Sequence, residues 1–164
     1  MIDIPNDNNL EIKVLAALMN TSDAIHIIAS VLQPSSFYTN DNRMIYVTCI
    51  ELYNASKIPD MSLVAAELKG KVDLITISNI AGEFCDEMVL PDYCRVLKEL
   101  EMRRDMLAGI SKMQKAASLD NDIFDLTAEV SSYLDKVGAA PKETIVNTTT
   151  LFKDTFKAIE EAST

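Results

Sequence analysis

Apolar positions in the first third of the chain repeat with the period of an α-helix. Leu10, Val14 and Leu18 lie four residues apart, which predicts a helix over residues 9–20 with one apolar face. Ser22 has the side chain of an N-cap, and the residues after it predict a second helix that ends before Pro34. The side chains expected to face inward from this second helix are Ile25, Ile28, Ala29 and Leu32.

The helical period continues to about residue 90. A third helix is predicted over residues 41–55, and a short helix is predicted to end at Gly70, a residue that suits the left-handed C′ position. Another short helix is predicted over residues 75–84. Together these elements predict a globular helical head over residues 1–90.

From Pro91 the apolar pattern changes to a heptad repeat. The sequence predicts a helix over residues 91–118 that is followed by a turn and by a second helix ending at Gly138. The two helices predict an antiparallel helical hairpin over residues 91–138. Its apolar seam needs a partner, because two helices cannot cover it on every side. The seam positions are Tyr93, Val96, Leu100, Leu107 and Ile110 on the first helix, flanked by Leu97, Met106 and Met113, and Ile123, Leu126, Val130, Tyr133, Leu134 and Val137 on the second.

Residues 139–147 lack periodicity and are predicted to be a linker, which is followed by one amphipathic helix over residues 148–164. An isolated helix of this length is marginal in water, so its apolar face is expected to dock on another surface. The residues of that face are Leu151, Phe152, Phe156 and Ile159. The predicted fold class is all-α: a globular helical head, a long helical hairpin and a C-terminal linker helix.

Charge and cysteine content narrow the function classes. The formal net charge of −10 repels a phosphate backbone, so direct binding of nucleic acid by this chain alone is not expected. Cys49, Cys85 and Cys94 show no C-x-x-C spacing and are expected to be buried, reduced thiols of a cytoplasmic protein. The N-terminus does not resemble a signal peptide, and no apolar stretch is long enough to span a membrane.

Patterns for catalysis or for metal binding are not found in the sequence. One histidine, His26, and three dispersed cysteines do not provide the closely spaced ligands of a zinc site. Gly70 and Lys71 lack the other residues of a phosphate-binding loop, and the segment from Asp120 lacks the glycine and glutamate of a calcium loop. Catalytic, cofactor-binding and metal-binding residues are therefore predicted to be absent.

A small basic patch is predicted within the long helix, where Arg103 and Arg104 follow Lys98. Acidic residues lie at or near ion-pair spacing from this patch, so salt bridges are favoured over nucleic-acid contact. These acidic residues are Glu99, Glu101 and Asp105.

A longer pattern, L-x-P-x-x-F-Y-x4-R-x-I-Y-x4-E-L-Y, spans Leu32 to Tyr53. It resembles the N-terminal domain of DnaB-family replicative DNA helicases. Glu11 with residues 14–18 resembles the first helix of that family, residues 64–68 resemble its V-A-E-E-L helix, and the run from Tyr93 to Arg104 is similar to the start of its hairpin. The resemblance covers roughly residues 8–137. The sequence departs from the family pattern at Ile12 and Ala16, and it lacks a Gly-Gly pair near Leu74.

The resemblance implies a non-catalytic collar domain of a hexameric, ATP-dependent helicase that unwinds DNA at the replication fork. The ATPase domain, with its ATP and magnesium, would follow after Thr164. Hairpins of neighbouring subunits would pair, and three such dimers would form a ring. Primase, and possibly a helicase loader, would bind to this collar, whereas DNA would be bound only through the full-length hexamer.

Three sets of contact residues follow from this interpretation. The dimer or hairpin interface is predicted at Tyr93, Val96, Leu97, Leu100, Leu107, Ile110, Met113, Leu126, Val130 and Leu134. A primase or collar contact is predicted at Leu119, Ile123 and Phe124, with ordinary packing of the hairpin tip as the alternative. Docking of the linker helix is predicted at Leu151, Phe152, Phe156 and Ile159. A second hypothesis is a self-contained helical adaptor that binds a host helicase or primase.

Overall fold

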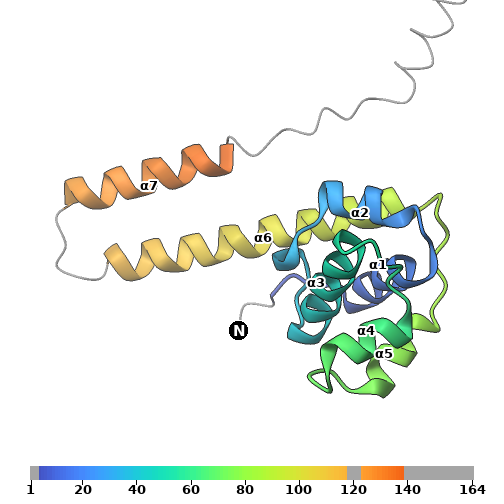
Figure 1. Ribbon diagram of the computed structural model, residues 1–164. Coiled ribbons are helices and arrows are strands. Elements are labelled where there is room, and N and C mark those ends of the chain that lie inside the picture. Colours follow the sequence, from blue (N-terminus) through green and yellow to red (C-terminus); the bar gives the residue numbers. More distant parts are fainter. Residues whose placement is uncertain (1–3, 118–122, 139–164) are drawn as a thin grey trace, which may run out of the picture. The chain divides into compact units, whose positions relative to one another are not determined.

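A computed structural model describes residues 4–117 and 123–138, which form helices joined by loops with no strand among them (Figure 1). The all-α prediction is confirmed. The chain divides into two compact units, Met1–Ala108, here called the head unit, and Gly109–Thr164, here called the hairpin unit. The elements are α1 (Asn8–Asn20), α2 (Ala24–Val31), the 3-10 turn η1 (Pro34–Ser36), α3 (Asn40–Asn54), α4 (Met61–Leu68), α5 (Leu74–Ala81), α6 (Leu90–Ala117) and α7 (Ile123–Gly138).

Short polar side chains cap three helices of the head unit. Asp7, Thr39 and Asp60 each accept a hydrogen bond from a backbone N–H in the first turn of α1, α3 and α4. At the end of α4, Gly70 has a φ of 78°, so the prediction of a left-handed residue there is confirmed, although Lys69 is also left-handed. The helix boundaries therefore follow from local backbone chemistry.

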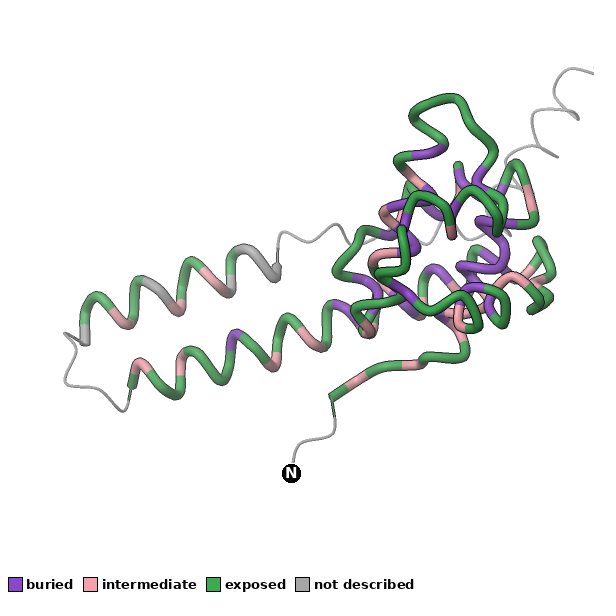
Figure 2. The backbone as a smooth tube through the Cα atoms, turned by 60° about the horizontal axis from the view of Figure 1, so that its bottom comes forward, coloured by how far each residue is buried: buried purple, intermediate pink, exposed green. Residues whose placement is uncertain are grey.

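α1 forms the centre of the head unit. Val14, Leu15 and the residues up to Met19 are all buried, and α1 contacts α2, α3 and α5. A helix that is apolar on all sides is found where it is surrounded by other elements. Figure 2 shows the buried positions gathered in these helices of the head unit. Phe37, from the segment after η1, is fully buried in the same core.

Three local predictions differ from the structure. α2 begins at Ala24 after Asp23, whose side chain makes no cap hydrogen bond, so Ser22 is not the N-cap. Ala29 is exposed rather than inward-facing, because the buried stripe of α2 is Ala24, Ile25 and Ile28. α5 ends at Ala81, and Phe84 lies in the following loop with 81% of its surface exposed.

The first part of α6 belongs to the head unit rather than to the hairpin. Leu90, Cys94 and Leu97 are fully buried in the core of the head. Every residue of α6 up to Ala108 is grouped with the head unit by its contacts. The division between the two units thus lies within α6, beyond the predicted boundary at residue 90.

In the hairpin unit, α7 packs against the last turns of α6. The ring of Tyr133 lies on the backbone of Gly109, where an added Cβ atom would come within 2.6 Å of Tyr133 Cε2. Glycine is thus needed at this position for the close approach of the two helices. The backbone of both helices agrees with the ranges predicted from the heptad pattern.

Candidate interaction surface and its anchor

A buried carboxylate attaches α6 to the segment around η1. Glu101 is 1% exposed, and it accepts hydrogen bonds from Gln33 Nε2 at 2.5 Å, from Ser36 Oγ at 2.7 Å and from Lys98 Nζ at 2.9 Å, as well as from Ser35 Oγ. Burial by itself would raise the pKa of Glu101, but these four hydrogen bonds outweigh burial and lower the pKa to about 2. The carboxylate is therefore ionised over the physiological range and satisfied by donors from two elements.

Arg104 makes a second attachment one turn further along α6. Its guanidinium donates to the carbonyl oxygens of Pro5 at 3.0 Å, Ser35 at 2.9 Å and Ser36 at 2.8 Å. The same group lies 5.9 Å from the ring centroid of Tyr38. A planar guanidinium with several donors suits this multiple contact better than an ammonium does. Arg104 therefore joins the N-terminal segment, the η1 turn and α6.

The segment after α2 is held from its other side by α1 and α3. Arg43 donates to the carbonyl oxygens of Pro34 and Phe37, and Tyr46 Oη donates to the carbonyl oxygen of Leu32 at 2.7 Å. Glu11, fully buried, accepts hydrogen bonds from the backbone N–H of Tyr38 and from Asn42 Nδ2. The residues of the L-x-P-x-x-F-Y-x4-R-x-I-Y pattern thus share one polar and aromatic network. We call this network, together with Glu101 and Arg104, the anchor.

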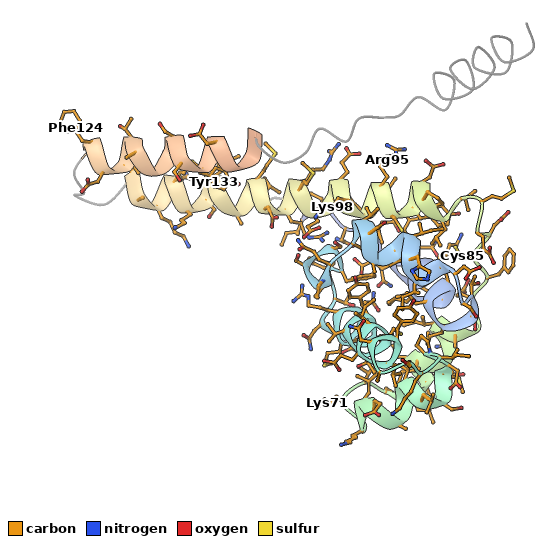
Figure 3. The ribbon with its side chains drawn as sticks, turned by 45° about the horizontal axis from the view of Figure 1, so that its top comes forward. Lys71, Cys85, Arg95, Lys98, Phe124 and Tyr133 are labelled. Atoms are coloured by element: carbon orange, nitrogen blue, oxygen red, sulfur yellow. The ribbon has the colours of Figure 1, made fainter. Side chains whose placement is uncertain are left out.

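The basic patch on α6 is explained by this network. Arg103 forms an ion pair with Glu99 at 2.6 Å, and Lys98 forms one with Glu101, which confirms the prediction of salt bridges for these two residues. The hydrogen bonds of Arg104 go to backbone carbonyl groups instead of to a carboxylate, so the prediction was wrong in the kind of partner for that residue. Figure 3 labels Lys98 on α6.

On the head side of α6, the predicted interface residues have different environments. Leu97 is fully buried in the core, so the expectation that it flanks an uncovered seam is wrong. Tyr93 and Leu100 are half-buried against that core. Val96 and Leu107 are also half-buried. A heptad position cannot by itself distinguish a residue packed on the head from one that faces outward.

An apolar strip remains exposed on the same part of α6. Met102 is 40% exposed and Met106 is 44% exposed, four residues apart on one face of the helix. Both lie beyond the core residues, on the stretch that Glu101 and Arg104 hold in place. This strip of Met102 and Met106 is an apolar surface on a helix that Glu101 and Arg104 bond to the head.

The hairpin unit presents apolar side chains of its own. Ile110 is 54% exposed, whereas Met113, Leu126 and Val130 are half-buried. Phe124, predicted to contact primase or the collar, is 81% exposed (Figure 3). The other predicted contact residues lie outside the part of the chain that the structure describes. They are Leu119, Leu151, Phe152, Phe156 and Ile159, together with the side chains of Ile123 and Leu134.

The anchor carboxylates were missed by the sequence interpretation. Glu101 was expected to be one acid of a surface salt-bridge series, and Glu11 was used only as a feature of the family resemblance. The donors to Glu101 from Gln33, Ser35 and Ser36 lie 65–68 residues away in sequence. The donors to Glu11 from Tyr38 and Asn42 lie 27–31 residues away. A helical pattern does not reveal such long-range partners. The only signal is that both acids belong to helices that also carry the family pattern.

The part of the chain that the structure describes has neither a metal site nor a membrane span. Among residues 4–117 and 123–138, no cluster of histidine, cysteine, aspartate and glutamate could hold a metal ion. Within the same ranges, none of the helices is both long enough and apolar enough to span a membrane.

Comparison with known proteins agrees with this architecture. The fold and the anchor define an all-α domain in which a helical head carries one long, firmly attached helix. The sequence model of the DnaB-like helicase N terminal domain matches residues 3–99, more than half of the 164-residue chain. The chain therefore belongs to the DnaB-like helicase N-terminal domain family.

The fold is similar to that of a solved DnaB helicase domain. The N-terminal domain of DnaB helicase from Mycobacterium tuberculosis superposes with a TM-score of 0.72 and 20% sequence identity. The match covers 79% of this chain and 99% of that domain, so it extends beyond the residues matched by the family. No curated protein matches the sequence.

Proposed function

We propose that the chain is the N-terminal collar module of a hexameric, ATP-dependent replicative DNA helicase. The module acts through assembly, and the parent protein unwinds duplex DNA at the replication fork. The observation that carries this proposal is the combination of the anchor with the exposed strip of Met102 and Met106. Because hydrogen bonds of the anchor hold the helix beside this apolar strip, little conformational freedom would be lost when a partner covers the strip.

The occupant of the strip is a second copy of the chain, and three such pairs form the ring of the parent protein. Primase binds to the collar near the exposed Phe124, and a helicase loader is a further partner. DNA is bound only through the full-length hexamer, in keeping with the net charge of −10. ATP and magnesium belong to the motor domain of the parent protein. Family membership and the uncovered apolar side chains support these assignments.

Sedimentation of the 164-residue chain tests the pairing. The wild type is expected to form dimers, and the double variant Met102→Glu, Met106→Glu is expected to be monomeric with an unchanged circular dichroism spectrum. A matched control is Ile58→Glu, which places the same charge at an apolar residue of the head that is 70% exposed. A wild type that stays monomeric at millimolar concentration would refute pairing through α6.

The gene itself tests the assignment to a helicase. Its reading frame after Thr164 is expected to encode a phosphate-binding loop of the form G-x4-G-K-[ST]. A stop codon at that point would favour the self-contained adaptor instead. Capture of primase by the chain, lost in Phe124→Ser and kept in Ile58→Ser, would support the primase contact.

A further inference from the structure

The loop between α5 and α6 presents two large apolar side chains to solvent. Phe84 is 81% exposed and Met88 is 88% exposed. Glu83, Asp86 and Glu87 surround them, and residues 82–89 contain no basic residue. Asp86 fixes the turn, since its Oδ1 accepts a hydrogen bond from the backbone N–H of Met88 at 3.0 Å. We call residues 82–89 the acidic knob.

A cleft with the opposite character lies between α3 and α4. Its volume is about 370 Å³, and apolar atoms of Met44, Val47 and Leu68 line it. Arg43 and Lys71 also line this cleft, one from the first turns of α3 and one from the segment after α4. This volume falls within the range of roughly 300 to 1,000 Å³ that accepts a small organic molecule, so an aromatic side chain and a thioether are of suitable size.

Charged residues of both signs line the cleft. Glu51 and Glu67 line the cleft as well, but Glu67 forms an ion pair with Lys57 at 3.7 Å. Exposed Lys69 lies next to the cleft, two residues before Lys71. The two exposed lysines at this end favour an acidic partner.

The knob and the cleft lie on different sides of the head unit. Figure 3 shows Cys85, within the knob, well apart from Lys71. One copy therefore cannot close this contact on itself. A contact between two different patches of identical chains is heterologous, and it continues from copy to copy until the rotation closes a ring.

We propose that the acidic knob of one copy docks in the α3–α4 cleft of a second copy. Phe84 and Met88 enter the cleft over Met44 and Val47, while Glu83 and Glu87 face Lys69 and Lys71. The inference rests on the proposed self-assembly but uses a surface separate from the strip on α6. Two different contacts per copy are what a closed ring of paired subunits requires, because pairing through one surface alone stops at a dimer.

Charge reversal tests the contact in the 164-residue chain. The knob variant Glu83→Lys, Glu87→Lys keeps Asp86 and its turn, and the cleft variant Lys69→Glu, Lys71→Glu changes only exposed residues. Each variant is expected to weaken association beyond the dimer by about tenfold at low salt. The quadruple variant, in which both partners are reversed, is expected to restore it.

Two control measurements accompany the reversal. Asp23→Lys, Asp73→Lys carries the same change of charge at exposed N-cap positions whose side chains make no cap hydrogen bond, and it is expected to leave association beyond the dimer intact. Phe84→Ser is expected to weaken that association by about tenfold or more, whereas Ile58→Ser is not.

The outcomes separate this inference from the proposed pairing. The double variant Met102→Glu, Met106→Glu removes pairing through α6. If this variant still associates, and if the charge reversal in the knob then abolishes that association, the docking is supported even if pairing through α6 fails. The docking would be overturned if the knob variant and the cleft variant each self-associated as strongly as the wild type. Loss in both variants without recovery in the quadruple variant would also overturn it.

Discussion

Ser36 Oγ donates a 2.7 Å hydrogen bond to Oε2 of Glu101, a residue 65 positions later in the chain. This bond joins the η1 turn to the long helix, and both groups are fully buried. A buried charge is tolerated only when its hydrogen-bonding capacity is filled, and among the described residues no buried side-chain nitrogen or oxygen lacks a partner. The segment around Pro34 thus attaches to α6 through Gln33, Ser35 and Ser36, which stand at the unspecified positions of the family pattern.

Replacement of Glu101 is expected to destabilise the head unit. Glu101→Ala leaves four donors without an acceptor and is expected to cost about 2–4 kcal/mol in the free energy of unfolding. Glu101→Gln keeps the size of the side chain but removes the charge and points an amide nitrogen at donors, so a similar loss is expected. Urea unfolding followed by circular dichroism measures both.

A matched control lies on the same helix. Glu99 forms an exposed ion pair with Arg103, so Glu99→Ala is expected to change the free energy of unfolding far less than Glu101→Ala does. Equal losses for Glu99→Ala and Glu101→Ala would contradict the role given to the buried carboxylate.

The low pKa of Glu101 makes the stability of the fold dependent on pH. The folded-state pKa of about 2 lies below the ordinary value of 4.5, so the ionised carboxylate stabilises the fold fully above pH 4.5. This contribution, about 3 kcal/mol for a difference of this size, is lost as the pH falls from 4.5 towards 2. The free energy of unfolding of the wild type is therefore expected to approach that of Glu101→Gln as the pH falls.

Thermal unfolding between pH 7 and pH 3 measures this convergence. Glu51→Gln, at an exposed carboxylate of α3, provides the control and is expected to remain parallel to the wild type over this range. A constant difference between wild type and Glu101→Gln at all pH values would show that the charge of Glu101 is not the stabilising feature.

The helices could be predicted from the sequence because the burial of each one depends on a local period. α1, α3 and α6 begin and end within a residue or two of the predicted positions. Gly70 was also identified correctly, since its requirement for a positive φ is a local property of the backbone. Local patterns therefore suffice for the class and order of the elements.

The environments of single side chains on α6 could not be predicted in the same way. Leu97 and Met106 were both predicted to flank the heptad seam, yet Leu97 is fully buried in the head and Met106 is 44% exposed. Glu101 has the residue type of a surface position and is buried, because its partners come from a segment distant in sequence. Burial along a helix depends on where the head ends, and that is a property of the tertiary structure.

The three cysteines are expected to react at different rates. Burial raises the pKa of Cys49 to about 12. Burial, with a smaller effect of nearby Cys85, also raises the pKa of Cys94 to about 12. A rise from 9.0 to about 12 lowers the thiolate fraction about a thousandfold. Cys85 lies in the loop before α6 and is half-buried, so the prediction of a fully buried thiol was wrong for it. Burial also raises the pKa of Cys85, although nearby Lys13 lowers it.

Labelling with iodoacetamide at pH 8 followed by peptide mass spectrometry measures the order. Cys85 is expected to be modified first, and Cys49 and Cys94 only when the chain is unfolded in urea. Cys85→Ser removes the early modification and is the control. Similar rates for all three thiols in the folded protein would contradict the buried positions of Cys49 and Cys94.

The contact between Gly109 and Tyr133 determines the effect of an alanine in the hairpin unit. Alanine in a helix interior is usually more favourable than glycine by about 1 kcal/mol. At Gly109 the new Cβ would overlap the ring of Tyr133, so the ring must leave its half-buried position and lose its packing. We therefore expect Gly109→Ala to give no gain, or a loss of about 1 kcal/mol, in the wild-type background.

A double-mutant cycle separates the two effects. With Tyr133→Ala already present, Gly109→Ala is expected to stabilise the chain by about 1 kcal/mol, because only the helix propensity then remains. Thermal unfolding of the four proteins, with hydrogen exchange of the α7 amides, gives the coupling energy. Ala108→Gly is the reference for propensity at a neighbouring exposed position of α6. The same change in stability from Gly109→Ala in both backgrounds would mean that α7 does not pack on α6 at this glycine.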